Sequence, residues 1–242
     1  MSAGTPHDRT IAGGRRVRQL EFPGPAGRLE GVLFCRVDER PPAAAVFCHP
    51  HPQMGGTMHN RVAYRASEAI FARGLPTLRF NFRGVGRSQG EWSGGAGEVE
   101  DAAAAAAFLS QLYPGRPLLL GGFSFGAGVA LSLGPRDGRV AALLAVAPAV
   151  RGRDFSALAR SGKPKAVVLG TADEFCPLAD LRSSYPEWSE PKAIRLVAGA
   201  GHFFDGRLGE LAAAVHSLLE EPAMAGALGL GGHSVLHGED LP

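Results

Sequence analysis

The feature that most constrains the fold is residues 118–130, an apolar run that passes through Gly122, Ser124 and Gly126 into a segment of small residues. This pattern is typical of a buried strand, a sharp turn and a helix. Glycine is required at both flanking positions because a Cβ there would strike the neighbouring strand or helix. The turn raises the serine hydroxyl above the strand end, beside the positive end of the helix dipole. Ser124 is therefore the candidate nucleophile, and a purely structural Gly/Ser turn is the alternative.

Apolar strand-like runs alternate with helical segments from residue 43 to residue 220. This alternation predicts an α/β fold in which a mostly parallel sheet has helices on both faces. Two strand-like segments, 16–22 and 29–37, come before it and are joined by a Pro/Gly-rich turn. They predict an antiparallel N-terminal hairpin. Functional residues are expected at the carboxyl ends of the parallel strands.

The length of 242 residues suits one domain with a single core. We expect this domain over residues 15–222. Residues 1–14 are rich in small and polar residues, and residues 223–242 are rich in glycine. A flexible N-terminal head and a flexible C-terminal tail are therefore predicted.

The composition argues against several classes of partner. The formal net charge is only +2, so binding to nucleic acid or another polyanion is not indicated. No apolar run reaches the roughly 18 residues of a membrane span, and the first residues lack the apolar core of a secretory signal. Three cysteines, Cys35, Cys48 and Cys176, form no C-x-x-C pair. We expect reduced, mostly buried thiols and a cytoplasmic location.

Two loops after Ser124 supply the groups that a serine nucleophile needs. A serine hydroxyl reacts poorly near neutral pH unless a base removes its proton and a third group orients that base. Asp173 follows one apolar run and His202 follows the next, so both loops should leave the sheet edge that holds Ser124. The chain order suits this architecture, with His202 as base and Asp173 as its orienting partner. Glu174 and Asp180 could compete with Asp173, and a loop histidine bonded to backbone is the alternative for His202.

The loop after the first parallel strand, residues 49–57, has two interpretations. In the first, the backbone N–H groups of His51 and Phe125 form an oxyanion hole that faces the substrate carbonyl oxygen. In the second, His49, His51 and His59 lie close enough to bind a metal ion. No carboxylate completes this ligand set, and Cys48 is the one nearby thiol. We therefore expect no metal site.

The glycine-rich loop 84–90 follows a predicted strand, which raises the question of nucleotide binding. Its third glycine comes one residue too late for G-x-G-x-x-G, and no helix opens immediately after it. A nucleotide cofactor is therefore not expected. We predict instead that Arg83 and Arg87 pair with acids such as Glu98 or Asp101 and hold the loop in place.

Together these motifs resemble the α/β-hydrolase superfamily. The chain looks most like a group of lidless bacterial serine hydrolases related to dienelactone hydrolases and short-chain carboxylesterases. The matching motifs are HPHPQMGGTMHN at 49–60, RFNFRGVGRS at 79–88, GFSFG at 122–126, the loop that contains Asp173, and GHFF at 201–204. The resemblance implies an α/β-hydrolase fold and cleavage of carboxylic esters through an acyl-enzyme on Ser124. It implies no cofactor.

The segment between the strands near 146 and 165 is too short for a helical lid. An open cleft with Phe125, Phe175 and Phe203 near its mouth suits a small-molecule ester with a short or exposed acyl group. A thioesterase or peptidase would use the same catalytic residues, and a catalytically silent scaffold that binds a ligand or partner would keep the same fold.

Overall fold

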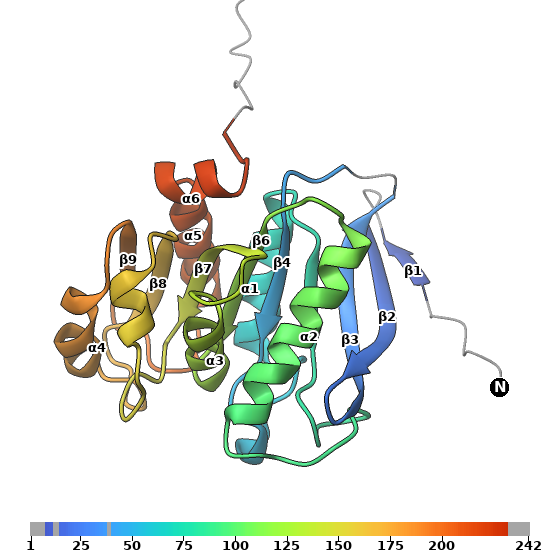
Figure 1. Ribbon diagram of the computed structural model, residues 1–242. Helices are drawn as coiled ribbons and strands as arrows, with labels where there is room; N and C mark the ends of the chain where they lie inside the picture. The colour runs from blue at the N-terminus through green and yellow to red at the C-terminus, as the bar shows by residue number, and fades with distance from the viewer. Residues whose placement is uncertain (1–7, 12–14, 38–39, 232–242) are drawn as a thin grey trace, which may run out of the picture.

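The protein is described here by a computed structural model that covers residues 8–11, 15–37 and 40–231. These residues form a nine-stranded sheet in the order β1-β2-β3-β5-β4-β6-β7-β8-β9 (Figure 1). The strands are β1 (Asp8–Ile11), β2 (Arg15–Gly24), β3 (Gly27–Arg36), β4 (Ala44–Cys48), β5 (Thr77–Phe80), β6 (Leu118–Phe123), β7 (Val140–Val146), β8 (Lys165–Gly170) and β9 (Lys192–Val197).

The six α-helices of this part of the chain are α1 (Arg61–Ala72), α2 (Ala96–Leu112), α3 (Phe125–Leu133), α4 (Leu178–Ser184), α5 (Leu208–Leu219) and α6 (Pro222–Ala227). Three short 3₁₀ turns complete the structure, namely η2 (Pro52–Met54), η3 (Ser156–Arg160) and η4 (Tyr185–Glu187). Strands and helices alternate from β4 to α5 as predicted, and the architecture is that of the α/β-hydrolase fold.

The predicted antiparallel hairpin is confirmed, and its turn is tighter than expected. β2 and β3 stay in register up to the Gly24–Gly27 pair, so only Pro25 and Ala26 lie between the strands. Gly27 has φ of 121°, a value that L side chains rarely adopt. β3 then pairs antiparallel with β5, which joins the hairpin to the parallel strands from β4 to β9.

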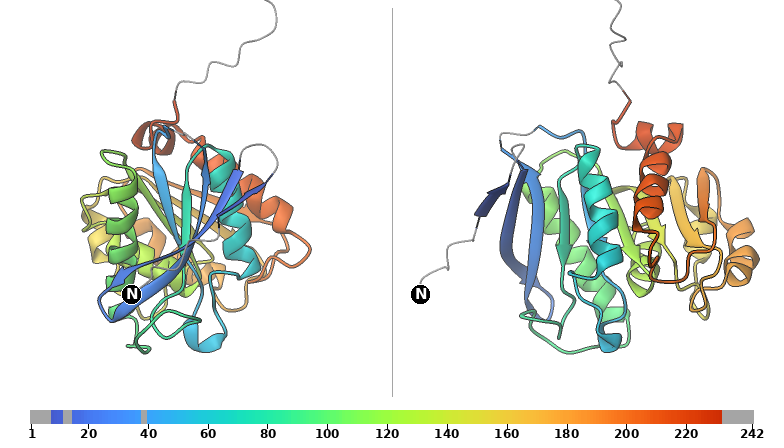
Figure 2. Two further views of the ribbon diagram at one scale, coloured as in Figure 1. Left: turned by 90° about the vertical axis from the view of Figure 1, so that its right-hand side faces the viewer. Right: turned by 180° about the vertical axis from the view of Figure 1, so that it is seen from behind.

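The helices cover both faces of the sheet. α1 and α5 pack together on one face, and α2 and α3 pack together on the other (Figure 2). α1 buries Val62, Ala66 and Ile70, which follow one another at four-residue spacing along one side of the helix. Asn60 caps this helix by accepting hydrogen bonds from the N–H groups of residues 62 and 63. The apolar residues at helical spacing in the sequence therefore form the buried side of this helix.

Both ends of the predicted domain extend further than expected. β1 lies within the expected flexible head and pairs antiparallel with β2. α6 lies within the expected flexible tail, and it buries Met224 while Leu228 just beyond it is also buried. Apolar side chains at these positions gain stability from burial, so the ordered chain continues to residue 231. The other residues of the expected head and tail, 1–7, 12–14 and 232–242, lie outside the described part.

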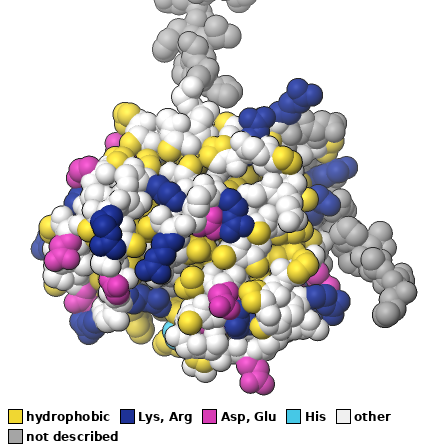
Figure 3. All heavy atoms as spheres, viewed as in Figure 1, with side chains coloured by type: hydrophobic (Ala, Val, Ile, Leu, Met, Phe, Trp, Pro, Cys, Tyr) yellow, Lys and Arg dark blue, Asp and Glu magenta, His cyan; other side chains and the backbone are white. Residues whose placement is uncertain are grey.

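The connection between β7 and β8, residues 147–164, contains only the short η3 turn. No helical lid is therefore inserted at this position, as expected from the sequence. Among the described residues, no helix combines the length and the apolar character that crossing a bilayer requires. On the face seen in Figure 3, basic and acidic side chains are interspersed with apolar ones, in keeping with the near-neutral net charge.

Candidate active site

Ser124 stands on a strained turn between β6 and α3. Its φ of 55° and ψ of −115° lie outside the regions that non-glycine residues usually occupy. A Cβ on Gly122 would lie 2.3 Å from the backbone of Gly126, and a Cβ on Gly126 would lie 2.4 Å from the carbonyl oxygen of His49. Only glycine fits at these two positions, so the turn has the close packing that the motif predicted.

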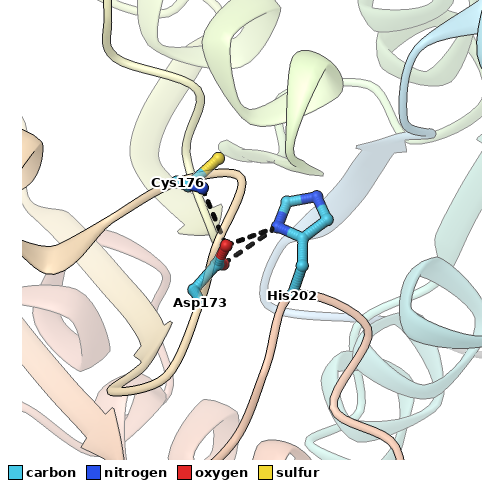
Figure 4. Close-up of side chains that lie close together, drawn as sticks. All are labelled: Asp173, Cys176 and His202. Atoms are coloured by element: carbon cyan, nitrogen blue, oxygen red, sulfur yellow. Dashed lines mark hydrogen bonds and ion pairs between the residues drawn. The ribbon is translucent and has the colours of Figure 1, made fainter.

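Ser124, His202 and Asp173 form a hydrogen-bonded chain. His202 Nε2 lies 3.1 Å from Ser124 Oγ, and His202 Nδ1 lies 2.9 and 3.0 Å from the two carboxylate oxygens of Asp173. Figure 4 shows the imidazole with its Nδ1 edge turned toward the carboxylate. Asp173 and His202 are buried, whereas Ser124 is partly exposed. This arrangement can move a proton from the serine hydroxyl to the imidazole.

Neither of the two acids that could compete with Asp173 is bonded to the His202 ring. The Glu174 carboxylate accepts a long hydrogen bond of 3.4 Å from the backbone N–H of His202. Asp180 forms an ion pair with Arg151 at 3.0 Å. Asp173, in contrast, accepts hydrogen bonds from the backbone N–H groups of Phe175 at 3.0 Å and Cys176 at 2.7 Å. These bonds fix the carboxylate against the imidazole, so Asp173 is the acid that contacts His202.

Cys176 is a further neighbour of the candidate catalytic groups, and no sequence pattern indicates this position. Its sulfur lies within 4.8 Å of ligand atoms of Asp173 and His202. Burial, followed by the negative charge of Asp173, raises the pKa of this thiol to about 12, and the neighbouring Ser124 hydroxyl opposes the shift. The thiol is therefore neutral at pH 7 and is a wall of the site rather than a second nucleophile. Its proximity could not be read from periodicity, because loop side chains have no regular direction.

The proposed oxyanion donors have free N–H groups. Within residues 8–11, 15–37 and 40–231, neither His51 nor Phe125 has an acceptor for its backbone N–H. Their rings lie 5.1 Å apart, so the loop after β4 reaches the start of α3. A Cβ on Gly56 would lie 2.2 Å from the carbonyl oxygen of Pro50, which shows how tightly this loop folds back. The two donors are thus available near Ser124.

Among the described residues, the three histidines of the loop are not brought together as a cluster of metal-ligand atoms. His49 is fully buried, where its Nδ1 donates to the carbonyl oxygen of Pro50 at 2.6 Å and its Nε2 accepts from Phe82 N–H at 3.1 Å. Burial lowers the pKa of His49 to about 4, although the bond to Pro50 opposes this shift. His51 Nδ1 accepts from the Gln53 N–H. In the described chain, the group with clustered metal-ligand atoms is instead Asp173, Cys176 and His202 (Figure 4).

Arg83 pairs with Asp101 as predicted, and Arg87 also pairs with an acid, although not with one of the two that the sequence suggested. The Arg83 guanidinium binds the buried Asp101 carboxylate through Nε and Nη2 at 2.8 to 3.1 Å. Arg87 instead donates to Glu30, at 2.7 Å from its backbone N–H and 3.0 Å from its Nε. Glu98 is occupied by backbone N–H groups at the start of α2. Glu30 lies in the hairpin, far from these residues in sequence, and its contact with Arg87 needed the tertiary fold.

We refer to Glu30, His49, Asn81, Arg83 and Asp101 as the supporting network. Asn81 links the hairpin to the loop after β4, because its Nδ2 donates to the Glu30 carboxylate at 2.7 Å and its Oδ1 accepts from the Met58 N–H at 2.8 Å. Although burial alone would raise the pKa of Glu30, hydrogen bonds from Arg87 and Asn81 hold it below its ordinary value. The network fixes the loops after β4 and β5 beneath the candidate site.

Two of the three predicted cleft aromatics are exposed. Phe175 and Phe203 have 57% and 42% of their surface accessible, and both rings lie 5.1 Å from the His202 ring. Phe125 differs, because only 5% of it is exposed and its ring lies against Trp92, 5.3 Å away, and His51. The ring of Phe125 is therefore almost wholly buried, in contrast to the other two. The ring of Trp92, a residue that no sequence pattern indicates, lies 4.7 Å from the ring of His51.

Comparison with known proteins supports the same family. A family model described as serine aminopeptidase, S33, matches residues 40–198. An uncharacterized protein of Rickettsia prowazekii is 36% identical over 210 residues, which cover 83% of this chain and 88% of that protein. A solved α/β serine hydrolase homologue from Coxiella burnetii is 37% identical with a TM-score of 0.79, and covers 83% of this chain and 96% of its own.

A second solved structure bears on the missing lid. This protein from Xanthomonas campestris, described as an α/β serine hydrolase without lid, is 31% identical with a TM-score of 0.77. The match covers 84% of this chain and 93% of the other. The motif resemblance, the fold and the family match agree. The chain therefore belongs to the serine aminopeptidase S33 family, among the lidless α/β serine hydrolases.

Proposed function

We propose that the protein cleaves short or otherwise exposed carboxylic esters through an acyl-enzyme on Ser124. The observation that carries this proposal is the hydrogen-bonded chain from Ser124 Oγ through His202 to Asp173, built on a turn with positive φ. A binding scaffold has no need of a strained serine aligned with a buried histidine and carboxylate. The family match to serine hydrolases supports the same conclusion.

In the proposed reaction, Ser124 Oγ attacks the ester carbonyl carbon as His202 Nε2 takes the hydroxyl proton. Asp173 keeps the Nδ1 proton of the imidazole in place and stabilises the imidazolium that forms. The N–H groups of His51 and Phe125 donate to the carbonyl oxygen as it becomes negative. The imidazolium then protonates the departing alcohol, and a water molecule releases the acid by the same steps. No cofactor or metal takes part.

The exposed rings of Phe175 and Phe203, which pack against each other beside His202, would contact the substrate. Because no lid covers them, a small-molecule ester with a short acyl chain fits this surface better than a long lipid. Thioesters and amides would meet the same groups, so a thioesterase or peptidase remains the alternative reaction. Reduced, buried cysteines are in keeping with the proposed cytoplasmic location.

The test is labelling of the purified protein with a fluorophosphonate probe, alongside turnover of 4-nitrophenyl acetate and butyrate. We expect labelling and turnover by the wild type and the loss of both in Ser124→Ala. Ser132→Ala is the matched control, since Ser132 lies on the same helix with its Oγ bonded to the carbonyl oxygen of residue 128. This variant should label as the wild type does.

Three further outcomes separate the alternatives. A folded wild type that does not label would refute the acyl-enzyme and favour a binding scaffold. If the protein labels but cleaves acetyl thioesters or amino-acid 4-nitroanilides faster than the 4-nitrophenyl esters, those substrates would be preferred to carboxylic esters. Loss of turnover on addition of EDTA, without unfolding, would point to a metal-dependent hydrolase instead.

A further inference from the structure

Arg153 is a cation beside the candidate active site that the protein does not neutralise. It follows β7 in the loop where other hydrolases carry a lid, and its side chain is partly buried. Among the described residues, its guanidinium has no ion pair and no hydrogen bond. Asp154, the next residue, accepts from the Ser156 N–H at 2.8 Å, and Asp180 pairs with Arg151. Glu98, whose charge acts on His51, is held by the backbone N–H groups of Ser93 and Gly95.

The position of Arg153 is defined by three contacts with the site. Its Cζ lies 5.0 Å from the centre of the Phe125 ring. A Cβ on Gly128 would come within 2.8 Å of its Nε, so the side chain lies on the first turn of α3 where a glycine leaves room. Burial, followed by the charge of Arg153, lowers the pKa of His51, which places this cation beside the proposed oxyanion donors.

A partly buried guanidinium without an acid partner is unfavourable in the free protein. It has lost part of its hydration, and the stacking on Phe125 does not satisfy its N–H donors. Burial holds the pKa of Arg153 below its usual range, and no carboxylate acts against that shift. The positive end of α3 adds to the local potential. A carboxylate is the ligand that suits an unpaired guanidinium best, because it accepts two parallel hydrogen bonds from it.

We propose that Arg153 binds a carboxylate carried by the substrate, so that the preferred esters are anionic ones such as half-esters of dicarboxylic acids. This inference rests on the proposed function, and it adds the charge class of the substrate. Arg153 would act as a specificity-determining residue that orients the ester toward Ser124. An aminopeptidase substrate, which carries a cationic amine near the scissile bond, would be repelled by the same group.

The test compares anionic esters with neutral esters of the same shape. On the acyl side, monomethyl succinate is paired with methyl 4-oxopentanoate. On the alcohol side, 4-acetoxybenzoate is paired with 4-acetoxyacetophenone. Turnover is followed by pH-stat titration, and the ratio of kcat/KM within each pair cancels any general change in the catalytic centre. The pair that shows a preference identifies which side of the ester carries the charge.

We expect the wild type to prefer the anionic member of one pair by roughly tenfold or more, the usual effect of a charge-assisted hydrogen bond. Arg153→Met keeps most of the length without the charge and should bring the ratio to within about twofold of one, mainly through KM. Arg153→Lys should keep part of the preference. Arg151→Met is the matched control, because Arg151 is exposed and paired with Asp180, and its ratio should equal that of the wild type.

A wild type that prefers the neutral esters, or an unchanged ratio in Arg153→Met, would overturn the inference. Failure of the proposed function is distinguishable, because the wild type would then not react with the fluorophosphonate probe. In that case binding of monomethyl succinate to the Ser124→Ala protein is measured by calorimetry, with and without Arg153→Met. Binding that depends on Arg153 would support the carboxylate site by itself, and absence of binding would refute it.

Discussion

Two polar clusters lie at the same edge of the sheet, and they use the same kinds of residue in opposite ways. In the supporting network, both nitrogens of the His49 ring and both oxygens of the Asp101 carboxylate have permanent partners. In the candidate site, Asp173 fixes only one nitrogen of His202, and the other faces a serine hydroxyl. Residue type alone therefore does not distinguish a structural histidine from a reactive one. What differs is whether one nitrogen is left for chemistry.

The substitution Asp173→Asn should give the largest effect, a loss of catalytic rate that no change in the supporting network should match. An amide at this position reverses the hydrogen-bonding preference of His202 Nδ1 and leaves the imidazole in the wrong tautomer. We expect kcat for a 4-nitrophenyl ester to fall by roughly 10⁴-fold with little change in the thermal midpoint of unfolding. Asp180→Asn is the control and should keep wild-type kcat. If the Asp173→Asn protein keeps more than a tenth of the wild-type activity, Asp173 does not have its proposed role in the mechanism.

The supporting network should respond in stability rather than in rate. Asp101→Asn leaves the buried Arg83 guanidinium without its counter-charge, and breaking such a pair costs about 3–5 kcal/mol of unfolding free energy. Glu100→Gln is the matched control, because Glu100 contacts the same guanidinium at 3.4 Å from an exposed position. Its effect should stay within about 1 kcal/mol.

Urea unfolding measures both variants, with the midpoint as the readout and the slope as the check on two-state behaviour. The fraction of Asp101→Asn protein that remains folded should hydrolyse esters at close to the wild-type rate. Equal midpoints for the two variants would show that the buried pair is no more important than the exposed one. If fully folded Asp101→Asn protein hydrolyses esters more slowly than the wild type, the supporting network contributes to catalysis as well as to stability.

A smaller effect on stability is expected when a change of pH protonates His49. The unfolded chain binds a proton at this histidine near pH 6.5, whereas the folded protein, with a His49 pKa of about 4, does not until much lower pH. The unfolded state thus holds more protons between these values, so the free energy of unfolding should fall as pH decreases from about 6.5 to 4. The contribution of His49 is roughly 3 kcal/mol across this range.

Denaturant unfolding at several pH values checks this expectation. His49→Gln removes the titrating group, so its stability should depend less steeply on pH in the same range, whatever its absolute value. The exposed His59→Gln is the control and should run parallel to the wild type. If His49→Gln keeps the full slope, another group is responsible for the acid sensitivity and the buried, neutral state of His49 is wrong.

The sequence predicts the fold, and it predicts which side chains meet at the candidate site, because both depend on strand order. Parallel strands end at one edge, so a serine, an aspartate and a histidine that each follow a strand must meet there. Asp173 could not be separated from Glu174 in this way, since adjacent loop residues point in directions that only the local turn decides. The structure separates them through the backbone N–H groups of Phe175 and Cys176.

Residues in irregular segments were the ones that sequence patterns missed. Cys176, Trp92 and Arg153 all lie in loops, where no periodicity indicates which way a side chain points. The pair between Arg87 and Glu30 joins a loop to the hairpin across 57 positions of sequence, and only the packed sheet brings them together. Phe125 was expected to line the cleft mouth, but the first position of α3 directs its ring inward against Trp92.

The short connection between β7 and β8 also bears on the size of molecule that Ser124 can reach. Where a helical lid closes over a hydrolase, the substrate must be small enough to be enclosed and each turnover waits for the lid to move. Here Ser124, the proposed nucleophile, is partly exposed and has no lid over it, and Phe175 and Phe203 are exposed beside His202. An ester group displayed on a polymer or on another protein could therefore dock as readily as a free small molecule, and no gating motion would limit its turnover.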